Sequence, residues 1–192
     1  YKYIWNVTLK ISQLKKLAVV VVVLFISATG LSQEFDLGIK VGSNFATISD
    51  AENGPSSKTG IQAGVFAGMK LSEKAAIQVD LLYSQQGAEF NVGEFDLTYV
   101  NIPVVLKFYV FRKFNIQVGP QFGVLVDDTI KDLPSEIFEA ESSDISGIVG
   151  FGYDLPLGLR VDRRYNFGFT DVFKDFGGRN SVLTLAVGFA FL

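Results

Sequence analysis

The sequence has 192 residues, of which 48% are hydrophobic and 14% aromatic, and its formal net charge is −3. A chain of this length forms one domain, and the absence of cysteine excludes disulfides and thiolate metal sites. Histidine is also absent, which removes the usual base of serine hydrolases and the commonest zinc ligand.

Residues 1–32 have the composition of a secretory signal peptide. They carry four lysines and no acid, then an apolar stretch from Leu17 to Ile26, then small residues before Ser32. We expect Sec-dependent export and cleavage after Ser32. With the first small residues the apolar stretch covers about 12 residues, or ~18 Å as a helix, which is too short for a hydrocarbon core of ~30 Å. A retained N-terminal anchor is the alternative.

The rest of the chain, residues 33–192, alternates between apolar and polar residues. In the first stretch Leu37, Ile39 and Val41 alternate with Lys40 and Gly42. A period of two residues indicates β-strands. Eight such stretches follow one another, at about residues 35–47, 61–71, 77–86, 99–108, 115–124, 145–154, 159–167 and 183–191.

The polar positions of these stretches are rich in glycine and in long charged side chains of both signs. This composition suits a narrow lumen, where glycines leave room for lysine and arginine. The apolar positions would then face lipid, as in outer-membrane barrels. A soluble lipocalin-like barrel, which has an apolar interior and a polar exterior, is the alternative that this assignment disfavours.

The connections between the stretches are alternately short and long. The short ones lie near 72–74, 111–113 and 156–157; the long ones cover 48–59, 88–96, 127–143 and 171–180. Outer-membrane barrels have short periplasmic turns and longer external loops. We therefore predict an all-β, eight-stranded antiparallel up-and-down transmembrane β-barrel in the bacterial outer membrane.

Charged residues at inward positions predict an ionic network in the lumen. Burial of an unpaired charge is expensive, so we expect cations and carboxylates to neutralise one another and to plug the barrel. A narrow ion or solute path, or a ligand carrier, is the alternative, and acid-base chemistry by a carboxylate pair such as Asp80 with Asp162 is a further one. The predicted network consists of Lys40, Lys70, Asp80, Lys107, Asp154, Arg160, Asp162 and Arg164.

The loop from Asp127 to Ser143 predicts an acidic external surface. It could bind calcium or a basic partner, although the ligand spacing of an EF-hand is missing, and a merely solvated loop is the simpler interpretation. Its acids are Asp127, Asp128, Asp132, Glu136, Glu139 and Glu141, against the single base Lys131.

Three residues break the pattern of a lipid-facing, fully paired barrel. Arg163 falls at an outward position, where it would extend to the interface, meet a partner or turn inward at a bulge. Pro103 and Pro120 each remove a hydrogen-bond donor from a strand. Because a short turn joins their strands, we predict one local defect or bulge in the pairing.

Three segments resemble the PorT-like outer-membrane β-barrel family of small OmpA/OmpX-like barrels. They are Tyr99–Lys107, Gly119–Leu125 and Gly158–Gly168, preceded by Gly38–Phe45 near the start. The resemblance implies an eight-stranded barrel, and the founding member is associated with protein secretion across the outer membrane. Most relatives have no assigned activity, so the resemblance implies a location more than a task.

The sequence therefore predicts an outer-membrane protein with a structural or interaction role and no enzymatic activity or cofactor. No Gly-x-Ser-x-Gly elbow or Gly-x-x-x-x-Gly-Lys phosphate loop is present. Without residues 1–32, the 17 basic residues fall to 13 against 20 acids, a net charge of about −7, which argues against nucleic acid. We expect outer-membrane lipid and other envelope or secretion proteins as partners.

Overall fold

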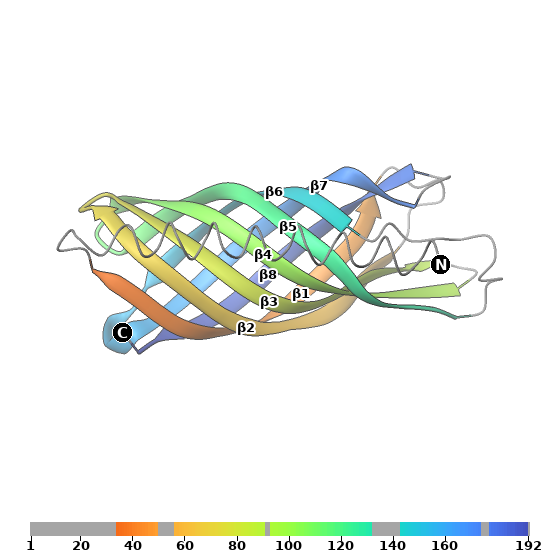
Figure 1. The fold of residues 1–192 in the computed structure, drawn as a ribbon, viewed down its shortest axis with the longest axis horizontal. Coiled ribbons are helices and arrows are strands. Elements are labelled where there is room, and N and C mark those ends of the chain that lie inside the picture. Colours follow the sequence, from red (N-terminus) through yellow and green to blue (C-terminus); the bar gives the residue numbers. More distant parts are fainter. Residues whose placement is uncertain (1–33, 50–55, 91–92, 132–142, 174–176, 192) are drawn as a thin grey trace, which may run out of the picture. The chain divides into compact units, whose positions relative to one another are not determined.

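The computed structural model describes residues 34–49, 56–90, 93–131, 143–173 and 177–191. The chain divides into two units, Tyr1–Glu34 and Phe35–Leu192, and the predicted signal peptide lies outside the described residues. Within the second unit eight strands and one short 3₁₀ helix are described (Figure 1). They are β1 (Phe35–Ser49), β2 (Ser56–Ser72), β3 (Ala75–Phe90), β4 (Gly93–Phe111), β5 (Phe114–Lys131), β6 (Ser143–Asp154), η1 (Pro156–Gly158), β7 (Leu159–Phe173) and β8 (Gly177–Ala190).

The strands form a closed barrel in sequence order. Each pairs antiparallel with its neighbours in the chain, and β8 returns to pair with β1. Closure gives every strand two paired neighbours and leaves no open edge, which is what a bilayer requires of a β-structure. The predicted fold class is confirmed. None of the described residues belongs to a helix long and apolar enough to cross a membrane.

The barrel is polar inside and apolar outside. Ile39 and Val41 are 52% and 57% exposed, whereas Lys40 between them is 1% exposed. The same alternation runs through the other strands, because successive side chains of a strand point to opposite faces. This distribution is the reverse of a lipocalin-like barrel, so the soluble alternative is wrong.

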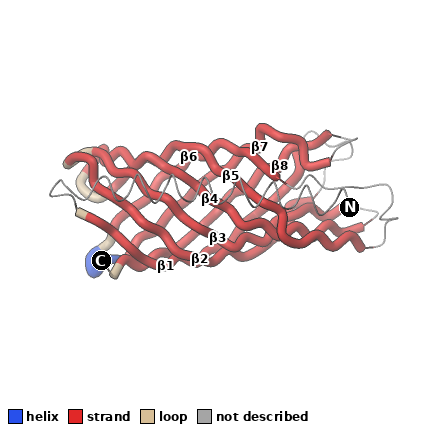
Figure 2. The backbone as a smooth tube through the Cα atoms, in the orientation of Figure 1, coloured by secondary structure: helices blue, strands red, loops and turns tan. Residues whose placement is uncertain are grey.

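Three short turns lie at the same end of the barrel as the start of β1 and the end of β8 (Figure 2). Hydrogen bonds join two of these turns to a neighbouring strand: the amide of Tyr109 in β4 donates to the carbonyl of Lys74, and the amide of Asp154 in β6 donates to the carbonyl of Lys113. Short turns mark the periplasmic end of an outer-membrane barrel.

The strands extend further at the external end than the sequence predicts. β3 ends at Phe90 and β4 begins at Gly93, so the predicted loop 88–96 shrinks to residues 91–92. The loop predicted at 127–143 shrinks to 132–142 in the same way. Polar residues continue the strands because backbone pairing does not depend on an apolar face.

Pro103 and Pro120 interrupt the pairing as predicted. The β3–β4 pairs stop at Val79–Val104 and resume at Leu82–Asn101, which leaves a gap opposite Pro103. The β4–β5 pairs have a similar gap between Pro103–Gln121 and Leu106–Val118, opposite Pro120. The register is the same on both sides of each gap, so the prolines remove pairs without inserting a bulge.

Arg163 is on the outer face of β7. It is paired with Phe151 of β6 and Leu185 of β8 in an unbroken register, and its side chain is exposed. A bulge that turns Arg163 inward is therefore excluded.

A substitution of Gly119, which lies beside the gap in the β4–β5 pairing, tests how closely these two strands pack. A Cβ at Gly119 would collide with the carbonyl oxygen of Val104 and lie 2.9 Å from the Cα of Val105. We expect Gly119→Ala to lower the free energy of unfolding by roughly 1–3 kcal/mol, measured by circular dichroism of urea unfolding in phospholipid vesicles. Gly68→Ala is the control, because its Cβ would be 3.4 Å from the nearest atom. Equal stability of the two variants would contradict this account of the packing.

Candidate functional site: the charged lumen

The centre of the lumen holds two cations and two carboxylates from three strands. Lys40 of β1 places its Nζ 2.9 Å from Asp80 Oδ2 and 2.8 Å from Asp162 Oδ2. Arg164 of β7 approaches the same two carboxylates, with distances of 2.6 Å to Asp80 and 3.5 Å to Asp162. Because β1, β3 and β7 lie on different parts of the wall, this cluster bridges the lumen.

Two glutamines hold the carboxylates of the central cluster in place. Gln78 Nε2 donates to Asp80 Oδ1 at 2.5 Å, and Gln117 Nε2 donates to Asp162 Oδ1 at 2.6 Å. Gln117 Oε1 also accepts from Arg164 Nε at 2.7 Å. Both glutamines are buried, so each adds neutral hydrogen bonds to charges that have no access to water.

A second ionic cluster lies towards the periplasmic end. Arg160 of β7 pairs with Asp36 of β1 at 2.5 Å and approaches Asp154 of β6 at 3.7 Å. Tyr109 of β4 donates its hydroxyl proton to the other oxygen of Asp154 at 2.7 Å. A neutral donor and a cation thus share one carboxylate, which fixes three strands to one another.

An aromatic ring separates the two clusters. Phe66 of β2 is 1% exposed, and its ring centroid is 5.6 Å from Lys40 Nζ and 5.1 Å from Arg160 Cζ. The ring has room because Gly38 and Gly188 have no side chains there: a Cβ on Gly38 would collide with the ring, and one on Gly188 would lie 3.2 Å from it. Phe66 therefore offers both cations a π face within the lumen.

Lys107 is the one cation of the predicted network without a hydrogen bond in the part of the chain that the structure describes. Its side chain is 1% exposed and its Nζ has no acceptor. Asp162 and Asp154 attract it electrostatically, but neither forms an ion pair with it. Across the two clusters the four cations Lys40, Lys107, Arg160 and Arg164 face the four aspartates Asp36, Asp80, Asp154 and Asp162.

Lys70 does not belong to this buried network. It has the inward register of its strand, but it lies near the periplasmic end of β2 and its side chain is exposed. Inward register therefore does not ensure burial at the end of a strand, because the lumen opens to water there.

The external half of the described lumen is polar but carries neutral hydrogen bonds. Asn44 Nδ2 donates to Ser84 Oγ at 2.9 Å, and Asn44 Oδ1 accepts from Thr184 Oγ1 at 3.0 Å. Asn166 donates to Gln121 at 3.2 Å. The predicted acidic loop is not part of this layer: residues 132–142 lie outside the described residues, as do the side chains of Asp127 and Asp128.

Chemically, this arrangement neutralises charge and fills space. Asp80 and Asp162, the weak candidates for acid-base chemistry, both contact the same two cations, Lys40 and Arg164. In the described ranges no group of three acidic, cysteine or histidine residues is placed to hold a metal ion.

Sequence reasoning missed the apolar residues of the lumen. The alternation indicates their inward register, because Phe66 stands between Gly64 and Gly68, but from the sequence we place only polar residues, glycines and Tyr99 in the lumen and give these apolar residues no face. The structure buries them inside the barrel; they include Phe66, Leu82, Val105, Ile148 and Val182.

Removal of one buried charge tests the central cluster. We expect Lys40→Met to lower the free energy of unfolding by roughly 3–5 kcal/mol, because two carboxylates lose their shared cation in a dry lumen. Lys74→Met removes the same charge from an exposed position of the turn between β2 and β3 and should change stability by at most about 0.5 kcal/mol. Urea unfolding in phospholipid vesicles measures both, and a Lys40→Met variant as stable as the control would contradict the proposed pairing.

Comparison with known structures returns small outer-membrane proteins. Neisserial surface protein A shares 13% sequence identity, with a TM-score of 0.54 over 84% of this chain and 100% of that one. Ail, the attachment invasion locus protein of Yersinia pestis, in complex with the heparin analogue sucrose octasulfate, shares 14% identity, with a TM-score of 0.52 over 82% of this chain and 99% of that one. At these identities the likeness concerns the fold alone.

A search of curated proteins gives no match. A family model, described as the outer membrane protein beta-barrel domain, matches residues 28–174. That match covers most of the barrel, and it agrees with a closed barrel that is apolar outside and charged inside. The chain belongs to the outer membrane protein beta-barrel domain family, whose members lie in the bacterial outer membrane.

Proposed function

We propose that this protein is a non-enzymatic, closed barrel that presents its external strand ends and loops as an interaction surface of the cell envelope. The observation that supports the closed state is the central cluster, in which Lys40, Asp80, Asp162 and Arg164 meet across the lumen. An eight-stranded barrel leaves an interior only wide enough for side chains. The barrel then serves to anchor what it displays.

A continuous ion path would have to pass buried groups at every level of the barrel. The Phe66 ring and the Arg160–Asp36 pair fill the periplasmic half, and the hydrogen-bonded Asn44 and Gln121 fill the external half. These side chains are between 0 and 8% exposed, apart from the half-buried Asp36. Opening an ion path through the lumen would break several hydrogen bonds of the ionic clusters at once. This is unfavourable because charges that lose their partners in a low dielectric are not stabilised by water.

A small channel or ligand carrier is the second candidate, and one observation favours it. The Nζ of Lys107 is buried and has no acceptor among the described residues, so it offers a positive charge to an anion inside the lumen. Asp154 Oδ1 also has no hydrogen bond, although Arg160 lies 3.7 Å from it. A bridging water would satisfy both groups without a transported ligand.

Planar-bilayer recordings distinguish the two candidates. We expect the purified protein to give no discrete conductance steps in 1 M KCl, because the ionic clusters occupy the lumen; a large porin in the same bilayer is the positive control. Reproducible steps that disappear in Lys107→Met would contradict the closed barrel and establish an anion path at that lysine.

The proposed interaction role extends to protein secretion. The segments Tyr99–Lys107 and Gly119–Leu125 support this extension through their resemblance to the PorT-like family. Both segments lie at the β4–β5 proline gap, whereas the other two resembling segments, Gly38–Phe45 and Gly158–Gly168, lie in β1 and at the start of β7.

Crosslinking in native outer membranes followed by affinity purification tests this extension. We expect a secretion component to co-purify reproducibly with the tagged protein and not with an unrelated eight-stranded barrel expressed at the same level. A barrel that is recovered without any reproducible neighbour would refute the secretion role and leave the closed-barrel proposal to be judged by conductance alone.

A further inference from the structure

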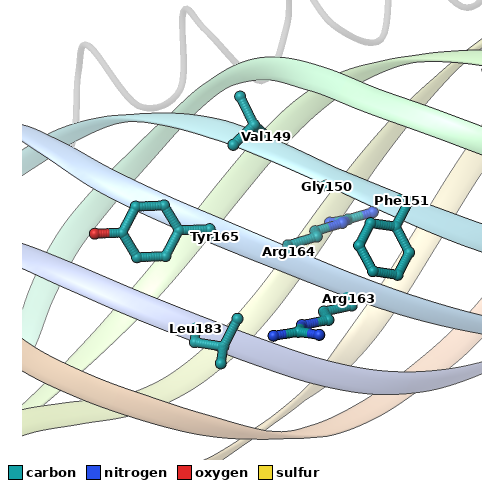
Figure 3. Close-up of a pocket in the computed structure, with 7 residues that line it drawn as sticks. All are labelled: Val149, Gly150, Phe151, Arg163, Arg164, Tyr165 and Leu183. Atoms are coloured by element: carbon teal, nitrogen blue, oxygen red, sulfur yellow. The ribbon is translucent and has the colours of Figure 1, made fainter.

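A groove lies on the outer face of the barrel, over β6, β7 and β8. Its side chains come from Val149 and Phe151 of β6, Arg163 and Tyr165 of β7, and Leu183 of β8 (Figure 3). Its volume is about 590 Å³. Apart from the arginine and the tyrosine hydroxyl, these side chains are hydrocarbon, and they face the bilayer.

Arg163 has no counter-charge among the described residues. Arg163 contacts an aromatic ring instead: its Cζ is 5.9 Å from the ring centroid of Phe151, which in turn is 6.0 Å from that of Phe114. Figure 3 shows Arg163 lying between Phe151 and Leu183 on the outer face. A cation in this position is costly without an anionic partner, so the groove requires one from outside the chain.

A second copy of the chain does not supply that partner from its strands. The aspartates of the strands whose side chains are described are directed into the lumen, as Asp80 and Asp162 are. Within Phe35–Leu192, the exposed acid among the described side chains is Glu73, which lies in the turn between β2 and β3 at the periplasmic end of the barrel. The partner must therefore carry its anion within reach of the extended Arg163 side chain.

The depth of Arg163 points to the periplasmic leaflet. It lies four residues beyond Leu159, where β7 begins at the periplasmic end. With a rise of ~3.3 Å per residue and a tilt of ~40°, this is ~10 Å along the barrel axis, less than half of an apolar band ~25 Å high. A guanidinium fork matches phosphate oxygens in two hydrogen bonds, and a phosphodiester attached to acyl chains also fits an apolar groove.

We propose that the Arg163 groove binds one glycerophospholipid of the periplasmic leaflet. The Arg163 guanidinium holds the phosphate, and the side chains of Phe151, Tyr165 and Leu183 contact an acyl chain. The head group beyond the phosphate is not recognised, because Arg164, the other charged residue of the lining, is 4% exposed and directs its guanidinium into the lumen towards Asp80. This site is independent of the lumen and of whether the barrel conducts.

Native mass spectrometry of the full-length purified protein tests the site. The protein is delipidated in mild detergent and then offered dioleoylphosphatidylethanolamine, dioleoylphosphatidylglycerol or the phosphate-free lipid monogalactosyldiacylglycerol at equal concentration. We expect one molecule of either phospholipid to be retained, at least tenfold more than the galactolipid. Retention of the galactolipid at the same level would overturn the proposal, because phosphate would then play no part.

Three variants locate the site on the barrel. We expect Arg163→Met to lose the retained phospholipid at least tenfold, Arg163→Lys to keep part of it, and Lys74→Met, at an exposed turn, to behave as the parent protein. Heat-modifiable migration in gels checks that each is folded, and Arg163→Lys keeps the test decisive if Arg163→Met does not fold. Unchanged phospholipid retention in the folded Arg163 variants would refute the site. If a membrane protein crosslinks to the barrel only when Arg163 is present, and no phospholipid is retained, the lipid site is refuted. A carboxylate of that protein would then be the partner of Arg163.

Discussion

Ionised side chains along the axis of a narrow barrel are stable only when they neutralise one another. The wall of this barrel removes water from Lys40, Asp80, Asp162 and Arg164, and the mutual contacts of these residues replace the lost hydration. Each charge touches two of opposite sign, so the cluster behaves as one unit whose members depend on each other. The same requirement explains why Gln78 and Gln117, rather than apolar residues, stand beside the carboxylates.

The lumen and the lipid face solve the problem of a buried charge in different ways. In the lumen the chain supplies both signs, and glycines such as Gly38 and Gly188 give the long side chains and Phe66 the space to meet. On the lipid face Arg163 stands without a carboxylate among the described residues; an arginine on this face costs roughly 2–4 kcal/mol at the bilayer midplane and less towards the interfaces. The charges of the lumen are neutralised within the chain, whereas the charge of Arg163 on the lipid face is not. The outer groove therefore depends on a partner from outside the chain.

Much of this structure follows from the alternation of residue types. Lys40 and Arg164 could be placed in the lumen because a period of two fixes the face of each residue in a strand. The gap at Pro103 and Pro120 followed from the missing amide donors. Phe66 could not be found from its type, because inside this barrel an aromatic ring is stabilised by cations that come from strands far away in the sequence. The exposure of Lys70 and the extra length of β3 and β4 depend on where the strands end, which alternation does not define.

The mutual dependence of the central charges can be measured directly by a double-mutant cycle between Asp80→Asn and Arg164→Gln, from urea unfolding in phospholipid vesicles. The account predicts a coupling free energy of roughly 0.5–3 kcal/mol, with the double variant less destabilised than the two single changes would give together. Strictly additive effects would mean that the two side chains do not depend on each other, and would contradict the neutralised lumen on which the closed barrel rests.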